Sequence, residues 1–362
     1  MELNAEQLAA VNAGPGAWCC LASAGSGKTR VLVERYKRLV AAGEDPRSIL
    51  CLAFTRKAAT EMRERAGAPI ALLHPCGFRT FHSLAYAFDL TENCGLLASE
   101  LISGAPDLNP SSIYSFMIAS MVRFLKTCRP LQPWWQAKWI MIDEANDLTL
   151  EQVELLQLLS QKHGNVWICG DVNQAIFGFA GSTPEPMVHF DRYFPGGRTL
   201  TMGVNYRSTR SIVEFRRRLA PIQTELLDRL NTSNEQGEAP TFRQYETNVG
   251  EVYGVSVEMN PNMHPNESRV VLARTNRQLE LFKSWNLPAM TIHKAKGLEF
   301  DNVWVIGCQD GYLPLTGADE EEESRLLFTA ASRAAKRLHL SCYGTPSKFI
   351  QKFIEDGTIR RV

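Results

Sequence analysis

Residues 21–32 read LASAGSGKTRVL. They follow the apolar run Ala17–Cys20 and open onto a helix-like segment that lasts until Gly43. A strand, a turn that contains glycines and a helix, in this order, form the layout of a phosphate-binding loop. The pattern G-x-x-x-x-G-K-[ST] fails only at its first position, which is Ala22. An ordinary glycine-rich turn is the alternative, and the Gly-Lys-Thr triplet in this context favours the phosphate loop.

The residue types in this loop match what phosphate chemistry needs. Gly25 and Gly27, with Ser26 between them, let backbone N–H groups curl around phosphate oxygens, and the N-terminus of the following helix adds partial positive charge. Lys28 is placed to reach the β- and γ-phosphates of a nucleotide. The Thr29 hydroxyl is placed to ligate Mg²⁺.

The composition is that of an ordinary soluble globular protein. The chain has 362 residues, of which 44% are hydrophobic and 22% are charged, and its formal net charge is +0. This length is long for one core and sufficient for two domains with an insertion. Neutrality excludes a globally basic nucleic-acid binder, but a local basic or aromatic groove stays compatible with it, because binding depends on where charges lie.

Nine cysteines occur without a CxxC pair, several of them in apolar, strand-like runs. This pattern indicates buried thiols in a reducing compartment rather than a disulfide framework. A metal cluster of His74, Cys76, His82 and Cys94 is an alternative, but its spacing matches no familiar site. The N-terminus is polar and acidic, without a signal-peptide apolar region, and no apolar run approaches membrane-spanning length. We therefore expect a cytoplasmic protein.

The first half alternates strands and helices. Leu3–Val11 reads as a short helix with Asn4 as its N-cap and Gln7 three residues further on. Ser48–Phe54 is typical of a buried strand, and it runs into Thr55–Arg65, a helix with a basic polar face. Charges on a helix face are more often simply solvated than functional.

Residues 89–133 lose this alternation, apart from one helical stretch, Ser112–Thr127. Clusters of Asn, Gly, Pro and Ser surround that helix, so we predict an insertion rather than a core layer. Trp134 and Trp135 follow among basic residues. Packing of these two rings onto the domain is favoured over a nucleic-acid platform.

The run Trp139–Glu144 reads as a buried strand that ends in two carboxylates. In a protein with a phosphate loop, this is the place of a Walker B pair: Asp143 holds Mg²⁺, directly or through water, and Glu144 orients and deprotonates the attacking water. A strand that merely ends in Asp-Glu is common. Its combination with Lys28 and Thr29 favours the functional interpretation.

The next strand, Val166–Cys169, leads to three further candidates. Gln174 is placed to sense a γ-phosphate, and Phe177 and Phe179 offer rings on which nucleobases stack. Taken alone, such an aromatic pair is more often part of a core.

The second half restarts the alternation with the strand Thr199–Met202. Its further predicted elements are the helix Thr209–Leu219, the strand Val270–Ala273, the helix Asn276–Trp285, the strand Val303–Ile306, the helix Glu321–Lys336 and the strand Arg337–Cys342. The polar stretch Asn231–Glu267 reads as loops with short strands. We predict an α/β protein with two parallel sheets and a cleft between two domains, residues 1–200 and 201–362.

In order and in spacing, nine segments resemble the motifs of the UvrD/Rep/PcrA family of superfamily 1 DNA helicases. They are Leu3–Gln7 (Q motif), Ala24–Thr29 (motif I), Phe54–Ala59 (Ia), Thr80–His82 (Ib), Asp143–Asp147 (II), Gly170–Phe179 (III), Asn205–Ser208 (IV), Thr291–Phe300 (V) and Arg325–Ala334 (VI). The resemblance covers nearly the whole chain except the insertion and residues 231–267, and it implies two RecA-like domains.

The resemblance also implies roles at an ATP site between the two domains. Gln7 would read the adenine edge, Arg30 would flank the base and Tyr206 would stack on it. Motif V would contact the nucleotide through Gly297 and Glu299, with Glu299 at the ribose. Three side chains would reach the γ-phosphate, and they are Gln174, Arg207 and Arg333.

Single-stranded DNA would, by the same resemblance, lie across the tops of both domains. Three rings would stack on bases, and they are Phe54, Phe177 and Phe179. Residues near the DNA backbone would be Thr55, Arg56, Thr80, His82 and His293.

The sequence departs from the family pattern in three respects. Asn146 stands in place of a glutamine in motif II, which puts in doubt the link between the nucleotide and motif VI. Phe177 and Phe179 replace a tyrosine and a tryptophan, so stacking remains while hydrogen-bonding groups are lost. The 1B insertion is reduced to about residues 89–133, and the 2B insertion is essentially absent.

The residues and the resemblance together predict a monomeric, ATP- and Mg²⁺-dependent DNA helicase or translocase of DNA repair or replication that moves on single-stranded DNA. Travel in the 3′→5′ direction is implied by the resemblance alone. Two other functions stay open. One is a translocase subunit that unwinds only with a partner, such as a nuclease or replication protein. The other is a module whose DNA binding is gated by nucleotide.

Overall fold

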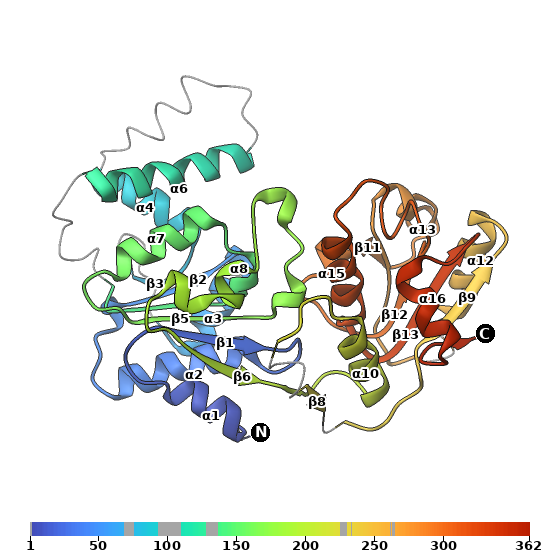
Figure 1. Cartoon of the computed structure of the whole chain (residues 1–362), viewed down its shortest axis with the longest axis horizontal. Helices are drawn as coiled ribbons and strands as arrows, with labels where there is room; N and C mark the ends of the chain where they lie inside the picture. The colour runs from blue at the N-terminus through green and yellow to red at the C-terminus, as the bar shows by residue number, and fades with distance from the viewer. Residues whose placement is uncertain are drawn as a thin grey trace. The chain divides into compact units, whose positions relative to one another are not determined.

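The computed structural model describes residues 2–68, 76–92, 110–127, 137–224, 230–232, 234–260, 262 and 265–362 (Figure 1). The chain divides into two compact units. Unit 1 comprises Met1–Ala22, Gly27–Val172 and Phe179–Met202, and unit 2 comprises Ser23–Ser26, Asn173–Gly178 and Gly203–Val362. Two short segments inside the first half of the sequence therefore belong to unit 2.

Unit 1 is built on a parallel sheet of six strands in the order β3-β2-β4-β5-β1-β6. The strands are β1 (Trp18–Ala22), β2 (Ile49–Ala53), β3 (Gly77–Thr80), β4 (Trp139–Ile142), β5 (Val166–Gly170) and β6 (Arg198–Met202). The four central strands are buried along their length apart from Trp18. Such continuous apolar runs are typical of parallel strands covered on both faces.

Helices cover both faces of this sheet (Figure 1). On one face lie α1 (Ala5–Asn12), α2 (Lys28–Ala41) and α3 (Arg56–Ala66), which share a core with Cys20, Cys51, Met141 and Cys169. On the other face lie α4 (Phe81–Glu92), α6 (Pro110–Thr127) and α7 (Leu150–Ser160). The shorter helices of unit 1 are η1 (Pro46–Ser48), η3 (Ala145–Asp147), η5 (Gly178–Ala180), α8 (Glu185–Val188) and α9 (Phe190–Tyr193), and η4 (Val172–Gln174) leads into unit 2.

Unit 2 contains a second parallel sheet of six strands, in the order β11-β10-β12-β13-β9-β14. These strands are β9 (Thr241–Tyr245), β10 (Arg269–Ala273), β11 (Ala289–Thr291), β12 (Phe300–Val305), β13 (Ala334–Tyr343) and β14 (Arg360–Arg361). A separate pair is formed by β7 (Val204–Asn205) and β8 (Asn231–Thr232).

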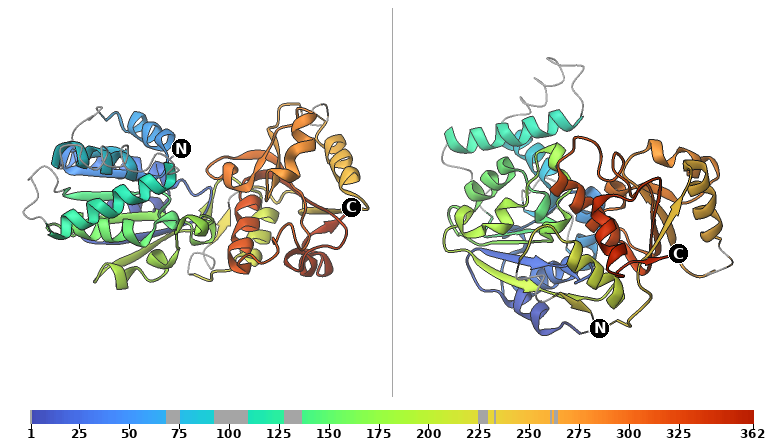
Figure 2. Two further views of the ribbon diagram at one scale, coloured as in Figure 1. Left: turned by 90° about the horizontal axis from the view of Figure 1, so that it is seen from above. Right: turned by 45° about the vertical axis from the view of Figure 1, so that its right-hand side comes forward.

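Helices again cover both faces of the sheet in unit 2 (Figure 2). One core joins the sheet to α10 (Arg210–Leu219), α14 (Ile292–Ala295), α15 (Glu320–Ala331) and α16 (Lys348–Glu355), and it includes Ile176. The core of the opposite face joins α12 (Asn248–Glu258), η7 (Arg277–Leu279) and α13 (Glu280–Ser284). Alternation along β10 explains this division, because Val270 and Leu272 enter the first core and Val271 and Ala273 the second.

The predicted fold class, two α/β domains with parallel sheets, is confirmed. Three details of the prediction are wrong. The strand at Thr199–Met202 does not begin the second sheet, because β6 pairs with β1 at the edge of the first. The stretch 231–267 contains a helix, α12, where only loops with short strands were expected, although the expected short strands are present as β8 and β9. The helix predicted for 321–336 ends at Ala331, because Ala334 already pairs with Phe300 in the sheet.

The insertion is described only in part. Its helix α6 lies next to α4 and α7 in both Figure 1 and Figure 2, and Trp134 and Trp135 lie outside the described residues. His74 and Cys94 of the alternative metal cluster also lie outside them, and no group of three metal-binding side chains occurs in the part that is described. Seven described cysteines are free and buried, as predicted.

The helix α12 provides a test of packing against the sheet. A Cβ atom on Gly254 would lie 2.3 Å from Cε1 of Tyr245, whereas one on Gly250 would meet Thr247 Oγ1 at 3.2 Å. Alanine normally stabilises a helix relative to glycine by about 1 kcal/mol. We predict that Gly254→Ala instead lowers the free energy of unfolding by about 1–3 kcal/mol because the core is overpacked. Urea denaturation of both variants measures this, and equal stabilisation by Gly250→Ala and Gly254→Ala would contradict the packing described.

Candidate nucleotide site and DNA-contacting residues

The loop between β1 and α2 has the backbone of a phosphate-binding loop. Gly25 and Gly27 both adopt positive φ angles, 79° and 83°. Gly27 is the N-cap of α2 and brings no side-chain cap, so the first N–H groups of the helix point toward the loop. The N-terminus of a 14-residue helix and these N–H groups together form an environment that favours phosphate oxygens.

Four side chains of unit 1 meet at the end of this loop. The Thr29 hydroxyl donates to Asp143 Oδ2 at 2.7 Å, and the Lys28 ammonium lies 3.9 Å from Glu144 Oε1. The sheet order explains their proximity, because only β5 separates β1 from β4 and the carboxyl ends of both strands lie at one edge. Sequence analysis predicted each of these residues, and the structure brings them together.

Burial changes the pKa of Asp143 in the acidic pair. Asp143 is only 4% exposed, and burial, followed by the neighbouring charge of Glu144, raises the pKa of its carboxyl. The Thr29 hydroxyl, the Lys28 charge and the Glu144 backbone N–H act in the opposite direction. A hydroxyl and a carboxylate on adjacent elements are hard oxygen ligands, and Mg²⁺ prefers such ligands. Thr29 and Asp143 therefore fit the predicted metal site.

Glu144 has a strained backbone. Its φ of 55° and ψ of 39° lie in the left-handed region, which residues other than glycine seldom adopt. Such strain persists where the surrounding structure fixes it, often at a functional site. Here it turns the side chain of Glu144 toward Lys28, while Asp143, one residue earlier, faces Thr29.

Two predicted adenine-contacting residues of unit 1 lie at the same loop. Gln7 is buried, and its Oε1 accepts from the Asn4 backbone N–H at 3.0 Å in a capping box. Its Nε2 would lie 3.0 Å from a Cβ atom on Gly27. Arg30 is half-buried in the first turn of α2. Gln7 is thus held by its own helix cap against the phosphate loop.

Asn146, the departure in motif II, connects two motifs within unit 1. Its Oδ1 accepts from the Asp171 backbone N–H at 3.1 Å, and its Nδ2 donates to Asp147. A Cβ atom on Gly170 would lie 2.6 Å from Asn146 Oδ1 and 2.9 Å from its backbone nitrogen. The shorter side chain therefore reaches the start of motif III directly, and only glycine leaves space for it.

In unit 2, the segment Ser23–Ser26 packs against motif IV. Asn205 Nδ2 donates to the Ala24 carbonyl at 2.6 Å, and the Tyr206 backbone N–H donates to the Gly25 carbonyl at 2.9 Å. A Cβ atom on Gly25 would lie 2.8 Å from Cβ of Arg207, so this close approach requires glycine. Asn205 is the residue here that sequence analysis left without a role.

Predicted γ-phosphate and ribose contacts gather in one cluster of unit 2. Arg207 donates through Nε to Glu299 Oε2 at 2.7 Å and through a terminal nitrogen to the Ser332 carbonyl at 2.9 Å. Arg333 is 2% exposed and donates to Gln174 Oε1 at 3.1 Å and to the Leu298 carbonyl at 3.1 Å. Gln174, Arg207, Glu299 and Arg333 therefore form a single network, joined by Ser332. Gly297 lies exposed beside it.

Three consecutive carbonyl groups of motif III accept hydrogen bonds from motifs V and VI. Lys296 Nζ donates to the Gln174 carbonyl at 2.6 Å, and Arg325 Nε donates to the Ala175 carbonyl at 2.8 Å. His293 Nε2 lies 3.2 Å from the Ile176 carbonyl. Sequence analysis missed the roles of Lys296 and Arg325, and their basic character within the motifs was the available signal.

His293 and Phe177 belong to this arrangement. Burial, followed by the charge of Arg274, lowers the pKa of His293 to about 4, so its neutral ring donates to the Ile176 carbonyl through Nε2. The Phe177 ring lies 5.8 Å from the His293 ring and 5.2 Å from Lys296 Nζ. The half-buried Phe177 is thus held in place by motif V.

The remaining predicted DNA contacts lie in unit 1, and their side chains range from exposed to buried. Phe179 is 73% exposed, and the half-buried Phe54 ring lies 5.7 Å from the buried Phe81 ring. Thr55 is the exposed N-cap of α3, and Arg56 follows it on the surface. Thr80 is buried, and its hydroxyl accepts from the Ser83 backbone N–H.

His82 lines a pocket of about 400 Å³ in unit 1. Phe116 of α6 and Ala180, the residue after Phe179, line the same pocket. Burial, followed by the charge of Arg56, lowers the pKa of His82. Motif Ib, the described helix of the insertion and the end of motif III therefore border one cavity.

Two family models match parts of the chain. The model of the UvrD/REP helicase N-terminal domain matches residues 3–94 and 112–195, and the model of the UvrD-like helicase C-terminal domain matches residues 283–345. The chain belongs to the UvrD/Rep helicase family. The suspected resemblance is thereby confirmed, and eight of the nine motif segments lie within the matched residues, whereas Asn205–Ser208 lies outside them.

Relatives of the chain carry helicase names. A "Probable DNA helicase" of Mycoplasma pneumoniae is 26% identical over 98% of this chain and 87% of its own length. The ATP-dependent DNA helicase PcrA of Leuconostoc citreum is 25% identical over 68% of this chain, and PcrA of Staphylococcus aureus is 25% identical over 79%. The chain spans 42% and 50% of the length of these two PcrA proteins. With the family, these names identify an ATP-hydrolysing enzyme of the DNA helicase class.

One solved structure shows a weaker likeness. The C-terminal domain of a possible DNA helicase from a Lactobacillus strain, WCFS1, covers 43% of this chain with 20% identity and a TM-score of 0.34. Separately, none of the helices in the described ranges combines the length and the apolar character that crossing a bilayer requires.

The two arginines of unit 2 should differ in their effect on stability. Arg333→Ala removes the hydrogen bonds of a buried guanidinium, including those to Gln174 Oε1 and the Leu298 carbonyl, and this should lower the free energy of unfolding by about 1–3 kcal/mol. Arg207→Ala removes an ion pair whose partner, Glu299, is 66% exposed, so the loss should stay near or below about 1 kcal/mol. Denaturation midpoints of both variants measure this. Equal midpoints would contradict the structural role of Arg333.

Proposed function

We propose that the chain is an ATP-driven motor that moves 3′→5′ on single-stranded DNA and couples ATP hydrolysis to strand separation. The observation that carries this proposal is the constellation of Lys28, Thr29, Asp143 and Glu144 in unit 1. It holds the groups that phosphoryl transfer to water needs, which are a phosphate-binding cation, two oxygen ligands for Mg²⁺ and a carboxylate base.

In this proposal, Lys28 and the backbone N–H groups of the loop hold the β- and γ-phosphates. Thr29 and Asp143 hold Mg²⁺, which neutralises charge that develops on the phosphate oxygens. Glu144 accepts the proton of the attacking water, and its strained backbone keeps the carboxylate oriented. The buried position of Asp143 strengthens each of these electrostatic interactions.

Unit 2 would supply the remaining contacts of the ATP site. Gln174, Arg207 and Arg333 would approach the γ-phosphate, Tyr206 the adenine ring and Glu299 the ribose. Support for this comes from the network that joins Gln174, Glu299 and both arginines through Ser332. The nucleotide then bridges two domains, residues 1–200 and 201–362, and its hydrolysis removes the ligand that they share.

DNA binding is proposed at aromatic and polar groups of both units. Phe54, Phe177 and Phe179 would stack on bases, and Thr55, Arg56, Thr80, His82 and His293 would lie along the strand. The exposure of Phe179 supports this most directly, because a large apolar ring in water is otherwise unfavourable. Since motif III contains both Gln174 and Phe179, a change at the γ-phosphate has a short path to the strand.

A second candidate is a monomeric cytoplasmic translocase that unwinds only with a partner, such as a nuclease or a replication or repair protein. The short connection between β10 and β11, which holds only η7 and α13, favours it because the accessory insertion expected there is essentially absent. Displacement of a strand from 3′-tailed and 5′-tailed duplexes by the purified protein separates the two candidates and gives the polarity. In a nucleotide-gated binding module, ATP would set the affinity for DNA or a partner and hydrolysis would be incidental, and a phosphate-release assay distinguishes this third candidate.

The ATP site is tested by variants of its base and its lysine. Glu144→Gln should reduce the ATPase rate in the presence of single-stranded DNA by roughly a hundredfold or more, because general-base catalysis is lost. Lys28→Ala should also abolish turnover. Phosphate release measures both, with Glu34→Gln on the surface of α2 as a control that should keep the wild-type rate. Undiminished turnover in the Glu144→Gln variant would refute the site.

The stacking surface is tested at its most exposed ring. Phe179→Ala should weaken binding of single-stranded DNA by about 1–3 kcal/mol, the value of one base–aromatic stack. Its melting temperature should stay close to that of the wild type, because the ring is 73% exposed. Fluorescence anisotropy with a labelled oligonucleotide measures the affinity, and Leu8→Ala, at an exposed position of α1, is the matched control. An affinity equal to that of the control would place the DNA elsewhere.

A further inference from the structure

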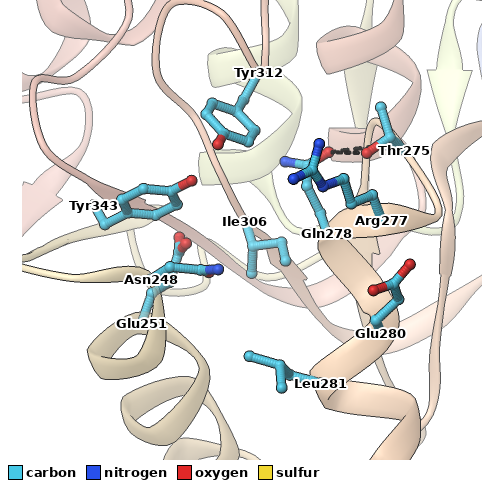
Figure 3. A pocket seen from close by; sticks show the side chains of 10 residues that line it. All are labelled: Asn248, Glu251, Thr275, Arg277, Gln278, Glu280, Leu281, Ile306, Tyr312 and Tyr343. Carbon is cyan, nitrogen blue, oxygen red and sulfur yellow. Dashed lines mark hydrogen bonds between the residues drawn. The ribbon is translucent and has the colours of Figure 1, made fainter.

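A pocket in unit 2 lies outside every site assigned above. It has a volume of about 340 Å³ and opens at the carboxyl ends of four parallel strands (Figure 3). Asn248 follows β9, Thr275 follows β10, Ile306 follows β12 and Tyr343 ends β13. In open α/β sheets, ligands bind in crevices at this edge. The position of the pocket is therefore that of a binding site.

One side of the pocket presents a buried carboxylate. Glu251 is 1% exposed, and its Oε1 accepts from the Gly307 backbone N–H at 3.0 Å and from the Ser341 hydroxyl at 2.6 Å. Within the described part of the chain, Oε2 accepts no hydrogen bond. Figure 3 shows Glu251 reaching into the pocket from the first turns of α12. Burial raises the pKa of this carboxyl, and a donor at Oε2 would stabilise its charged form.

The other lining groups include aromatic and cationic side chains. The rings of Tyr312 and Tyr343 lie 5.5 Å apart in an edge-to-face arrangement and form one wall (Figure 3). Burial, followed by the hydrogen bond between the two phenol groups, raises the pKa of Tyr343, so the Tyr343 ring stays neutral. Arg277 is exposed at the rim, and in the ranges that the structure describes its guanidinium forms no ion pair. Ile306 and Leu281 supply apolar surface.

We propose that this pocket binds one nucleotide unit, with the base against Tyr343, the exocyclic amino group of the base donating to Glu251 Oε2 and the phosphate at Arg277. Aromatic rings stack on any base, and arginine is a preferred phosphate ligand. The carboxylate adds selectivity, because adenine, cytosine and guanine carry an amino donor whereas thymine presents O4 and a methyl group. The unit belongs either to a free nucleotide or to a DNA strand, and the latter source rests on the proposed function.

The substitution Glu251→Gln tests the role of the carboxylate. The glutamine carbonyl can keep the hydrogen bonds from Gly307 and Ser341, and its NH₂ group then replaces Oε2 as the group that faces the pocket. The substitution thus replaces a hydrogen-bond acceptor, Oε2, by a donor, NH₂, while the side chain keeps nearly the same shape. The variant should therefore lose affinity for a base with an amino group and keep its affinity for thymine.

The measurement compares the oligonucleotides dC16 and dT16 by fluorescence anisotropy. The wild type should bind dC16 more tightly than dT16, and Glu251→Gln should shift this ratio roughly tenfold toward dT16, the loss expected for one hydrogen bond to a charged group. Calorimetry with dCMP and dTMP forms the second arm. A shift only with the mononucleotides identifies a free nucleotide, and a shift with the oligonucleotides identifies the strand.

Glu280→Gln is the matched control, because Glu280 also lines the pocket but lies exposed at its rim. This variant should leave the dC16/dT16 ratio unchanged, and an equal shift would show a general charge effect and overturn the proposal. The comparison of dC16 with dT16 on the wild type needs no variant. It can therefore be made even if Glu251→Gln fails to fold. Equal affinity of the wild type for both oligonucleotides and both mononucleotides would also overturn it. The DNA-stimulated ATPase activity of the wild type is measured in parallel. Its absence would count against the proposed function and not against the pocket.

Discussion

The hydrogen bond from Thr29 to the buried carboxylate of Asp143 is the constraint on which the rest of unit 1 depends. It joins the first turn of α2 to the end of β4, two elements that are 114 residues apart in sequence. A carboxylate that is 4% exposed is unfavourable unless hydrogen bonds and positive charge compensate it. Lys28, the Glu144 backbone N–H and the Thr29 hydroxyl provide that compensation. The phosphate loop and the acidic pair therefore stabilise each other, and a bound Mg²⁺ would strengthen the same arrangement.

A comparable constraint governs unit 2, although it acts on backbone rather than on charge. The carbonyl groups of Gln174, Ala175 and Ile176 point at three basic side chains from motifs V and VI. A short segment with every carbonyl held in this way cannot move independently of the second sheet, and Ile176 is also part of that sheet's core. The chain enters this segment directly from β5 of unit 1. Gln174 therefore lies on the covalent connection between β5 and the core of the second sheet.

Sequence reasoning predicted the local chemistry better than the tertiary connections. The glycines, Lys28, Thr29 and the Asp-Glu pair could be predicted because each serves a local geometry that its residue type reveals. The helix α12 was missed because Gly250, Gly254 and four valines weaken its helical pattern, which its contact with the sheet overrides. The edge strand β6 was assigned to the wrong sheet because strand pairing is not contained in periodicity. Lys296 and Arg325 were likewise missed, since nothing local shows that their partners are carbonyl groups about 120 and 150 residues away.

The two arginines predicted to reach the γ-phosphate differ in the contacts that each would have to break. Arg207 is held by Glu299, and an ion pair with so exposed a partner contributes about 0–1 kcal/mol. Glu299 is itself the predicted ribose contact, so nucleotide binding would exchange this pair for two new contacts at little cost. Arg333 is buried, and it donates to Gln174 Oε1 and to the carbonyl groups of Thr329 and Leu298. Breaking those bonds would cost more, so Arg333 is better suited to fix Gln174 than to move, and Arg207 is the arginine expected to change position on nucleotide binding.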